Sequence, residues 1–578
     1  MTAQSSPRSG MARLLTEMLP CPDSTLRPVL EFAVDAVLRA VQDGHTGLAL
    51  QDISDQAAGL HDWPADRVPA ALREVLGDGD APLVRRGDLI QLARWAQREA
   101  TLGAALMRRA AVEAPPIDDA WLDACISRLF TWEGRPPSGD ASEPSWGQQV
   151  AVRRLLGRRI GVLAGGPGTG KTTTVVRLLA ARMELATLQG SALPRVLLLA
   201  PTGKAAARLA QSVAAQVEGL QTEAVGKAAI PRVASTIHRA LGPLDRTLQR
   251  FRYHAQRKLP VDVVLVDEVS MVDLDLMSHL IAALPEAAEL VLIGDPDQLP
   301  SVGCGDLLRD VMMADPLEDV RSVLTYSHRF ASGGQIGAVA RSLLAGESGS
   351  LIEALGERFE DCVTIQQVRL RVCAAAREVF REDLDAPGMM TADARAARLL
   401  ERNTSLGILS ATRVGPTGVE ALNGVIENDL MREGLAHGPS RRWPGCPIIV
   451  RDNAPECGVF NGDVGVLSED EEGVLHAWFE DGSGGVRSVS LVRLPRYDLG
   501  LCLTVHQSQG SEMNQVLMVL PLRPNRGVYR ALLYTGVTRA KSTIDIVGGR
   551  AALREGVSRT VRRTGGLQRV MENLPAAG

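Results

Sequence analysis

A glycine-rich stretch, GGPGTGKTTT at residues 165–174, has the composition of a phosphate-binding loop. Its glycines allow positive φ angles, so that successive backbone N–H groups can turn inward around an anion. Lys171 is placed to reach the β- and γ-phosphates of a nucleotide, and the Thr172 hydroxyl is placed to join the coordination shell of Mg²⁺. The expected nucleotide contacts are Gly165, Gly166, Pro167, Gly168, Thr169, Gly170, Lys171, Thr172 and Thr173.

The sequence around this loop predicts the strand and the helix that the motif requires. RIGVLAG, residues 159–165, is apolar and is typical of a buried parallel strand. A helix is expected to begin near Thr172, with its positive end toward the phosphates. The alternative, a glycine-rich turn before an ordinary helix, is disfavoured by this strand–loop–helix context. The sequence thus predicts a site for ATP with Mg²⁺.

Two further segments place acidic and amide side chains after apolar strands. In VDVVLVDEVSMVD the strand ends at Asp267 and Glu268, at the sheet edge where α/β proteins bind ligands. Asp267 is expected to hold Mg²⁺ through water, and Glu268 to orient and deprotonate the attacking water. A solvated acidic strand end is the alternative. Gln298, in LIGDPDQLPSVG, has the reach to sense a γ-phosphate.

The composition limits the class of protein. The chain has 578 residues, 45% of them hydrophobic, which is enough for roughly three to four domains with ordinary cores. Its net charge of −5 gives no overall basic signal, so nucleic-acid binding would depend on a local groove. No apolar run has the length of a membrane span, and the eight cysteines form no C-x-x-C pair. We expect a cytoplasmic protein with reduced thiols and without a zinc or Fe–S site.

Changes in pattern divide the chain into an N-terminal helical domain and two α/β regions. Residues 1–115 have helical periodicity and contain no catalytic motif, and PPSGDASEPS at 136–145 is a Pro/Ser/Gly break. Aliphatic strands that alternate with helices predict one parallel α/β sheet within 116–345 and a second within 346–578. Residues 445–500 alternate apolar and polar positions between turns, which predicts a small β insertion in the second region.

Eight motifs in order resemble those of superfamily 1 helicases of the 5′ to 3′ class. They are GGPGTGKTTT, LLLAPTGKAAARLA, ASTIHRALG, VLVDEVSMVD, LIGDPDQLPSVG, LTYSHRF, LTVHQSQGSE and LLYTGVTRAK. Within that class the chain resembles the RecD family, the alpha subunits of RecBCD exonuclease V complexes, over nearly its whole length. The segments RYHAQRKLPVDVVLVDEVSMVDLDLM and APLVRRGDLIQLARWAQREATLGAAL favour this family. The resemblance implies two RecA-like P-loop motor domains, an SH3-like β insertion and ATP-driven translocation along the 5′-ended strand of single-stranded DNA.

The resemblance also implies roles for residues around the nucleotide. Gln148 matches the glutamine that recognises adenine, with a helix-surface amide as the alternative. Arg329 and Arg539 match two arginines that reach the γ-phosphate from opposite sides of the cleft, so that hydrolysis would require domain closure. A structural salt bridge is the alternative for each arginine. Gly510 and Glu512, in QGSE, are expected near the nucleotide.

Six polar residues match motifs that line a channel for single-stranded DNA across both domains. Small hydroxyls and backbone amides can hold phosphates there without reading sequence. A core or interdomain position is the alternative for the two histidines. The stretch RTLQRFRYHAQRKLP, residues 246–260, interleaves basic residues with Phe251 and Tyr253 and is either a basic, stacking arm on DNA or a solvated face. The six residues are Thr202, Thr236, His238, Thr504, His506 and Gln509.

The resemblance implies partner chains. No cluster of Asp, Glu and Lys outside the helicase motifs suggests a nuclease, so cutting would belong to a partner. The family implies RecB-like and RecC-like subunits in a heterotrimer that processes DNA double-strand ends for recombinational repair, with the N-terminal domain as the docking domain. One alternative is a stand-alone helicase related to RecD, a group that carries a longer N-terminal extension. Another is a nucleotide-gated scaffold without motor activity, which the complete set of motif residues disfavours.

Overall fold

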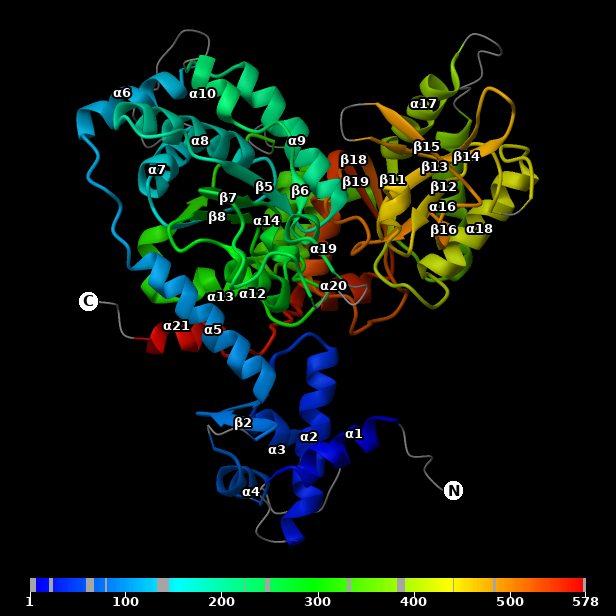
Figure 1. Ribbon diagram of the computed structural model, residues 1–578. Coiled ribbons are helices and arrows are strands. Elements are labelled where there is room, and N and C mark those ends of the chain that lie inside the picture. The colour runs from blue at the N-terminus through cyan, green and yellow to red at the C-terminus, as the bar shows by residue number, and fades with distance from the viewer. Residues whose placement is uncertain are drawn as a thin grey trace.

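The structure, a computed structural model, has four parts (Figure 1): an N-terminal domain, two α/β domains side by side, and a C-terminal tail, residues 559–574, that returns to the first α/β domain. Arg246, Cys21 and nearly all of the predicted break at 136–145 fall outside the described residues. Among the described helices, none combines the length and the apolar character that crossing a membrane requires. The structure describes residues 7–574 except for 20–23, 59–66, 78–80, 132–144, 223, 245–249, 330–333, 382–389, 440 and 482–484.

The N-terminal domain combines helices with a small antiparallel sheet, whereas the sequence predicted helices alone. The predicted helical segment at 24–44 forms α2, and Gly44 follows it with a φ of +89°. The strands have only three or four residues each, too few to give a periodic signal. The elements are α1 (Pro7–Glu17), α2 (Arg27–Gln42), β1 (Gly47–Ala49), α3 (Leu50–Ala58), α4 (Arg67–Val75), β2 (Leu83–Arg86) and β3 (Leu89–Leu92).

Helix α5 (Ala93–Ala110) joins the N-terminal domain to the first α/β domain, and the C-terminal helix α21 (Leu567–Asn573) packs against it. Figure 1 shows the two helices next to each other, although they come from opposite ends of the chain. Glu99 of α5 is 1% exposed and accepts hydrogen bonds from the Thr46 hydroxyl (2.5 Å) and from the backbone N–H of Gly566 (2.9 Å). The N-terminal domain, α5 and the tail therefore share one buried joint.

The first α/β domain contains a six-stranded parallel sheet with the order β6-β5-β7-β8-β4-β9. Its two faces bury separate apolar clusters, one with Val162 and Leu290 and the other with Leu163 and Ile293. The strands predicted in this region are confirmed. The strands are β4 (Ile160–Gly165), β5 (Val196–Ala200), β6 (Ser235–Thr236), β7 (Val263–Val266), β8 (Glu289–Gly294) and β9 (Arg321–Leu324). The helices are α6 (Asp119–Leu129), α7 (Trp146–Leu155), α8 (Lys171–Leu188), α9 (Gly203–Glu218), α10 (Ala224–Ala229), α11 (Ile237–Leu241), α12 (Leu274–Ala283) and α13 (Leu307–Met313).

The second α/β domain contains a five-stranded parallel sheet with the order β10-β19-β18-β11-β17. Helix α14 packs into its core through Ile336 and Val339, so the packing boundary precedes α14 and the predicted boundary at 345 is about ten residues too late. The strands are β10 (Phe359–Asp361), β11 (Leu406–Ser410), β17 (Cys502–Thr504), β18 (Met513–Val519) and β19 (Ala540–Gly548). The helices are α14 (Gln335–Ala345), α15 (Ser348–Leu355), α16 (Ile365–Phe380), α17 (Ala392–Ser405), α18 (Val419–Arg432), α19 (Arg530–Val537) and α20 (Arg550–Ser558).

The predicted β insertion is a five-stranded antiparallel sheet with the order β15-β14-β13-β12-β16. Trp478 on this sheet packs with Leu399 of α17 in a small apolar cluster. The strands are β12 (Pro447–Val450), β13 (Val464–Glu469), β14 (Leu475–Glu480), β15 (Val486–Ser490) and β16 (Tyr497–Leu499). Two parallel α/β sheets with this insertion confirm the predicted fold class. The cysteines that the structure describes are all free thiols, as expected.

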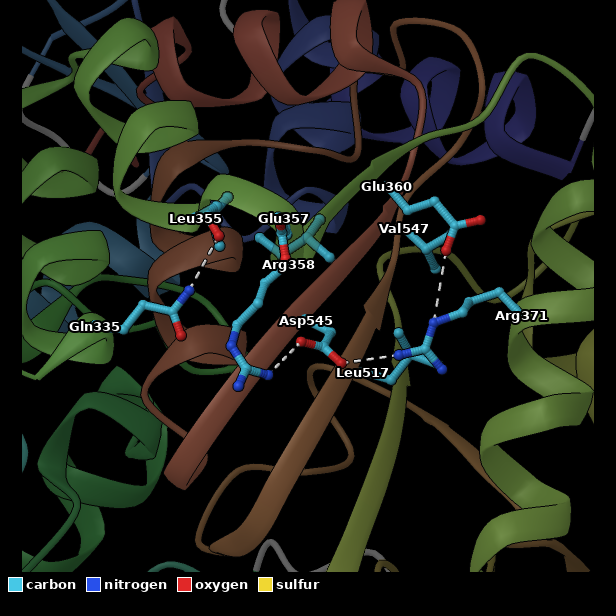
Figure 2. A pocket seen from close by; sticks show the side chains of 10 residues that line it. Gln335, Leu355, Glu357, Arg358, Glu360, Arg371, Leu517, Asp545 and Val547 are labelled. Atoms are coloured by element: carbon cyan, nitrogen blue, oxygen red, sulfur yellow. Dashed lines mark hydrogen bonds and ion pairs between the residues drawn. The ribbon is translucent and has the colours of Figure 1, made fainter.

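A hollow of about 500 Å³ lies against the second parallel sheet (Figure 2). Arg358 and Arg371 both pair with Asp545, at 2.9 and 2.8 Å, and Arg371 also lies 3.6 Å from Glu360. Both arginines of the hollow are paired with acidic side chains that line it, and none of the motif residues lines it. It is therefore separate from the candidate site.

Candidate nucleotide site between the two α/β domains

The glycine-rich loop connects β4 to α8, as the sequence predicted. Gly168 and Gly170 have φ values of +74° and +81°, which glycine adopts without strain. The Lys171 ammonium donates to the carbonyl oxygens of Gly165 (2.7 Å) and Gly166 (3.0 Å). The ammonium thus lies across the loop that is expected to bind phosphate. The predicted contacts Pro167 and Thr169 lie on the same turn, and Thr172 and Thr173 lie on the first turn of α8.

Gln148 of α7 contacts the loop from its other side. Its side chain is 5% exposed, and its amide nitrogen donates to the Thr169 carbonyl at 3.1 Å and lies 3.1 Å from a ring nitrogen of His328. A Cβ atom on Gly170 would overlap this amide. Gln148 is therefore not a helix-surface amide, and its recognition of adenine stays a prediction.

Asp267 and Glu268 follow β7 directly. Glu268 has a φ of +52°, a left-handed conformation that is uncommon outside glycine and is found where a site constrains the backbone. Burial and the neighbouring Glu268 carboxylate raise the pKa of Asp267 to about 6, while the charge of Lys171 acts in the opposite direction. The half-buried carboxylates of Asp267 and Glu268 and the Thr172 hydroxyl are the kind of oxygen donors that a hard divalent cation takes. These residues fit Mg²⁺, with Thr172 and Asp267 as the groups that would hold it.

Gln298 lies in the loop after β8 and bridges the two domains. Its amide nitrogen donates to Asp295 Oδ2 at 3.1 Å, and its amide oxygen accepts from Arg539 Nη2 at 2.9 Å. The Tyr534 hydroxyl, from α19 of the second domain, donates to the same Asp295 oxygen at 3.2 Å. The hydroxyl oxygen also lies 3.1 Å from the position a Cβ on Gly166 would take. The γ-phosphate sensor predicted from sequence is therefore held from both sides of the interface.

Arg539 is 3% exposed and lies entirely within this interface. Besides Gln298, its guanidinium donates to the carbonyl oxygens of Ser511 and Thr535, each at 3.2 Å. Burial lowers its pKa, whereas the nearby charge of Glu268 raises it. Arg539 makes no ion pair with any described carboxylate, so the salt-bridge alternative does not hold for this residue in the part of the chain that is described.

Arg329 lies beside the glycine-rich loop but points to a carboxylate. A Cβ on Gly168 would overlap the Cβ of Arg329. The Arg329 guanidinium is 2.7 Å from Glu512 Oε1, and the same oxygen lies 2.5 Å from Nη2 of Arg208 on α9. Burial would raise the pKa of Glu512, but Arg208 and Arg329 together lower it. The salt-bridge alternative thus describes Arg329 here, at a position where its backbone and Cβ border the loop.

A groove of about 970 Å³ separates the first α/β domain from the second domain and its β insertion. Thr236 lines the groove, and Thr202 begins a helix at its wall. The two hydroxyls cap α11 and α9 by accepting from backbone N–H groups at 3.1 and 3.2 Å. Gly510, which the sequence placed near the nucleotide, also lines the groove and lies against Thr202. Basic side chains at this groove are Lys204, Arg208, Arg232, Arg239, Arg487 and Lys541.

The other DNA-contact candidates do not share one environment. Thr504 is tied to Gln507 by hydrogen bonds of its backbone N–H and its hydroxyl. The Gln509 amide is buried and donates to the Leu299 carbonyl at 3.3 Å, so it contacts the loop after Gln298 and not the groove. His506 has an exposed side chain.

The predicted basic and stacking arm is only partly accessible. Phe251 is 6% exposed and packs between His238 and His279, with ring centroids 6.2 and 5.0 Å away, so Phe251 cannot stack on DNA. Burial lowers the pKa of His238, as expected for the core alternative. Tyr253 lies near the guanidinium groups of Arg252 and Arg257, at 5.6 and 5.7 Å from its ring centre. In the sequence Phe251 has the spacing of a residue that stacks on DNA bases, but in the structure its ring packs in the core.

The structure also brings together residues that sequence reasoning did not single out. These residues lie inside quoted motifs, and only their spacing in three dimensions reveals them. His328 donates its backbone N–H to Gly168 O at 2.9 Å, and the Ser327 hydroxyl donates to Pro167 O at 2.9 Å. The others are Asp295, Tyr534 and Arg208.

Comparison with known proteins gives matches over both α/β domains. The AAA domain model matches residues 148–304, and the UvrD-like helicase C-terminal domain model matches residues 499–545. The RecBCD enzyme subunit RecD of Mycolicibacterium smegmatis is 34% identical over 571 residues, which cover 97% of this chain and 96% of that protein. The ATP-dependent RecD2 DNA helicase of Deinococcus radiodurans is 32% identical, over 77% of this chain and 56% of that protein.

Among solved structures, Bacteroides Pif1 bound to single-stranded DNA is similar with a TM-score of 0.39 and 14% identity, over 70% of this chain and 92% of that one. This likeness is too distant to carry an argument. The match to RecD, in contrast, runs from the N-terminal domain through both α/β domains. It includes the loop, the acidic pair and the arginine that meet at the interface, so the chain belongs to the RecD family and is an ATP-dependent DNA helicase.

Proposed function

We propose that this chain is the 5′ to 3′ motor subunit of a cytoplasmic RecBCD-type helicase–nuclease, which processes DNA double-strand ends for recombinational repair. RecB-like and RecC-like subunits complete the heterotrimer, and a partner chain supplies the nuclease. The observation that carries the motor role is the contact of Arg539 with Gln298, because it joins the two α/β domains beside the phosphate loop.

The proposed chemistry assigns one task to each side chain of the site. The loop amides and Lys171 bind the phosphates, and Gln148 contacts adenine. Mg²⁺ supplies charge neutralisation when it is bound through Thr172 and Asp267. Glu268 accepts a proton from the water that attacks the γ-phosphorus, and ADP leaves as the bond to its β-phosphate oxygen breaks.

Coupling to movement comes from the arginines. Arg539 and Gln298 form a hydrogen bond that connects the domains through one guanidinium and one amide. When the γ-phosphate is present, the Arg539 guanidinium becomes its partner and stabilises the charge of the transition state. Arg329 contacts the γ-phosphate in the same way, after it breaks the ion pair with Glu512 that it makes in this structure. Each turnover therefore remakes contacts between the two domains.

The groove between the domains is the proposed path of the single strand. Thr202 and Thr236 present hydroxyls at the starts of two helices, whose N-termini favour phosphate. Six basic side chains line the groove against four acidic ones, Asp463, Glu480, Asp481 and Glu512, so the groove has a positive formal charge although the whole chain has a net charge of −5. Sequence-independent binding through phosphates is what a translocating motor requires.

The subunit role is favoured over the stand-alone helicase by the extent of the match. Identity to the RecD subunit of Mycolicibacterium smegmatis covers 97% of this chain, whereas identity to RecD2 covers 77%. The former takes in the N-terminal domain, the proposed docking domain, whose described residues contribute no side chain to the nucleotide site.

The test combines isolation from cells with a polarity assay. Affinity purification of the full chain at native level is expected to recover two larger partners and ATP-dependent nuclease activity. The complex should unwind a duplex with a 5′ single-stranded overhang. A complex in which this chain carries Lys171→Gln should lose the unwinding that starts from that overhang. Recovery of an active monomer would favour the stand-alone alternative. Preferential opening from a 3′ overhang by this subunit would contradict the polarity.

A further inference from the structure

One arginine in the C-terminal tail holds the loop that follows Gln298. Arg563 Nη1 donates to the carbonyl oxygens of Gly305 (2.8 Å) and Gly303, and lies 3.4 Å from the Ser301 hydroxyl. Its Nη2 donates to the Ser301 carbonyl at 2.5 Å. A single guanidinium thus binds three backbone carbonyls within five residues of one loop. This is a use for which the planar fork of arginine is suited and the point charge of lysine is not.

The N-terminal domain supports the same loop from the side. The backbone N–H of Gly305 donates to Gly44 O at 2.9 Å, and the Cys304 thiol donates to Val41 O at 3.3 Å. The tail is tied to that domain in turn, because Thr564 N–H donates to a ring nitrogen of His45 at 2.9 Å. The loop, the tail and the N-terminal domain therefore meet at one point.

The fit at this point leaves no space for other side chains. A Cβ on Gly44 would lie 2.5 Å from the Cζ atom of Arg563, and a Cβ on Gly303 would overlap the carboxylate of Asp273. Gly44 and Gly305 both have a positive φ, +89° and +90°, which other residues adopt only with strain.

The bonding of Arg563 distinguishes it from a surface arginine. Burial lowers the pKa of Arg563, and the charge of Asp306 is the largest effect in the opposite direction. No described carboxylate lies within ion-pair distance of it, so its hydrogen bonds go to the loop backbone and to Ser301. Hydrogen bonds from a charged donor are stronger than those between neutral groups, and each lost bond would leave a carbonyl without its partner.

We propose that Arg563 is a positioning residue for Gln298, through which the C-terminal tail and the N-terminal domain set the γ-phosphate sensor loop. The inference rests on the proposed role of Gln298 in hydrolysis. Only four residues separate Gln298 from Gly303, and Leu299 between them is fixed by Thr535 and Gln509 of the second domain. A displacement of the N-terminal domain is therefore transmitted to the sensor along a short, hydrogen-bonded segment.

The test uses the full chain and DNA-stimulated ATP hydrolysis. Arg563→Ala is expected to lower kcat about tenfold or more while KM for ATP stays within about threefold, because the phosphate loop is untouched. Arg563→Lys should restore little. Arg562→Ala, at the exposed neighbouring position of the same tail, serves as the control and should behave as wild type. In a Gln298→Ala background, Arg563→Ala should cause no further loss of kcat, since both act through one group.

The outcomes separate this inference from the proposed function. If Gln298→Ala alone keeps the turnover of wild type, the proposed role of Gln298 fails. Two results would overturn the inference even if Gln298→Ala has a lowered kcat. Either Arg563→Ala alone keeps the kcat of wild type, or the double variant loses kcat by the product of the two single losses. In both cases Arg563 only anchors the tail. Should Arg563→Ala not fold, hydrogen exchange of Arg563→Lys decides. Faster exchange of the amides in residues 301–305 together with a lowered kcat supports the positioning role of Arg563, and unchanged exchange contradicts it.

Discussion

Arg539 and Gln298 form a hydrogen bond of 2.9 Å across the interface between the two α/β domains. The two side chains come from sequence positions 241 residues apart, and both are buried. Because the Gln298 amide is also bonded to Asp295, and Asp295 to Tyr534, a chain of four polar side chains crosses the interface. Opening of the domains must break this chain.

Arg539→Ala is expected to lower single-turnover ATP hydrolysis by roughly 10³-fold or more, with nucleotide affinity within about tenfold of wild type. The reason is that the loop and Lys171 still bind the phosphates. Because the buried carbonyls of Ser511 and Thr535 lose a donor, the melting temperature should also fall. Hydrolysis is therefore measured per folded molecule, by active-site titration with nucleotide at a temperature well below the melting transition.

Two variants accompany this measurement. Arg539→Lys should rescue little hydrolysis, because an ammonium cannot span two phosphate oxygens. Arg526→Ala, at an exposed position of the same domain, should match wild type. Normal hydrolysis per folded Arg539→Ala molecule would refute the assignment of this arginine to the γ-phosphate.

Arg329 and Arg208 bind the same oxygen of Glu512, and this provides a matched pair of variants. If Arg329 reaches the γ-phosphate during turnover, Arg329→Ala should lower kcat about 10²-fold or more. Arg208→Ala removes an equivalent ion pair and should change kcat by less than about threefold. Steady-state ATPase at saturating DNA compares them. Equal losses in the two variants would indicate that both arginines serve only the ion-pair cluster.

Lys171→Gln should abolish ATP hydrolysis while the chain stays folded. Among the described residues the ammonium bonds to two loop carbonyls, so its loss removes a phosphate contact without opening the core. Hydrolysis below about 1% of wild type, with the melting temperature nearly unchanged, is the expected result. Lys227→Gln, on α10, is the control. DNA-stimulated hydrolysis that survives in Lys171→Gln would rule out the loop as the nucleotide site.

We expect the stability of the folded chain to depend on pH because of Asp310, which lies at the joint between the domains and the tail. Burial, then the charges of Asp306 and Glu99, raise its pKa well above the usual range, with Arg309 in opposition. The folded chain therefore keeps a proton that the unfolded chain releases near pH 4, so stability is lost as the pH rises from there through the folded pKa. Asp310→Asn removes this cost. Its melting temperature should exceed that of wild type at pH 8, by a margin that shrinks toward pH 4.

Asp319→Asn is the control for this pH series, because the Asp319 carboxylate is exposed and follows α13, the helix that contains Asp310. Its melting temperature should equal that of wild type at each pH. If Asp310→Asn is no more stable than wild type at pH 8, ionisation of the Asp310 carboxyl group does not destabilise the folded chain.

The sequence predicted what short-range spacing determines. The phosphate loop, the acidic pair after β7 and the strands of both sheets follow from motifs in which chemistry and secondary structure are adjacent in the chain. The position of Arg539 against Gln298 required the tertiary fold, although each residue had been identified on its own. Arg563 gave no signal, because its partners are main-chain carbonyls, which have no sequence signature.

The errors have physical causes as well. Phe251 lies among basic residues like a stacking side chain, yet its ring fills the core between two histidines. Helix α14 lies before the predicted boundary at 345, but its apolar face packs on the second sheet, and packing rather than position in the chain decides to which domain a helix belongs.

The joint of α5 with α21 has a consequence for biosynthesis. Glu99 and its partner Gly566 are 467 residues apart, and Gly103 of α5 lies against Val570. At a translation rate of about 5 to 20 residues per second, the ribosome needs about 20 to 90 s to make the second partner after the first. During that time one side of α5 has no cover, so the first domain to be synthesised is among the last to be completed. A ribosome that stops early therefore releases a chain in which the side of α5 that α21 would cover stays exposed.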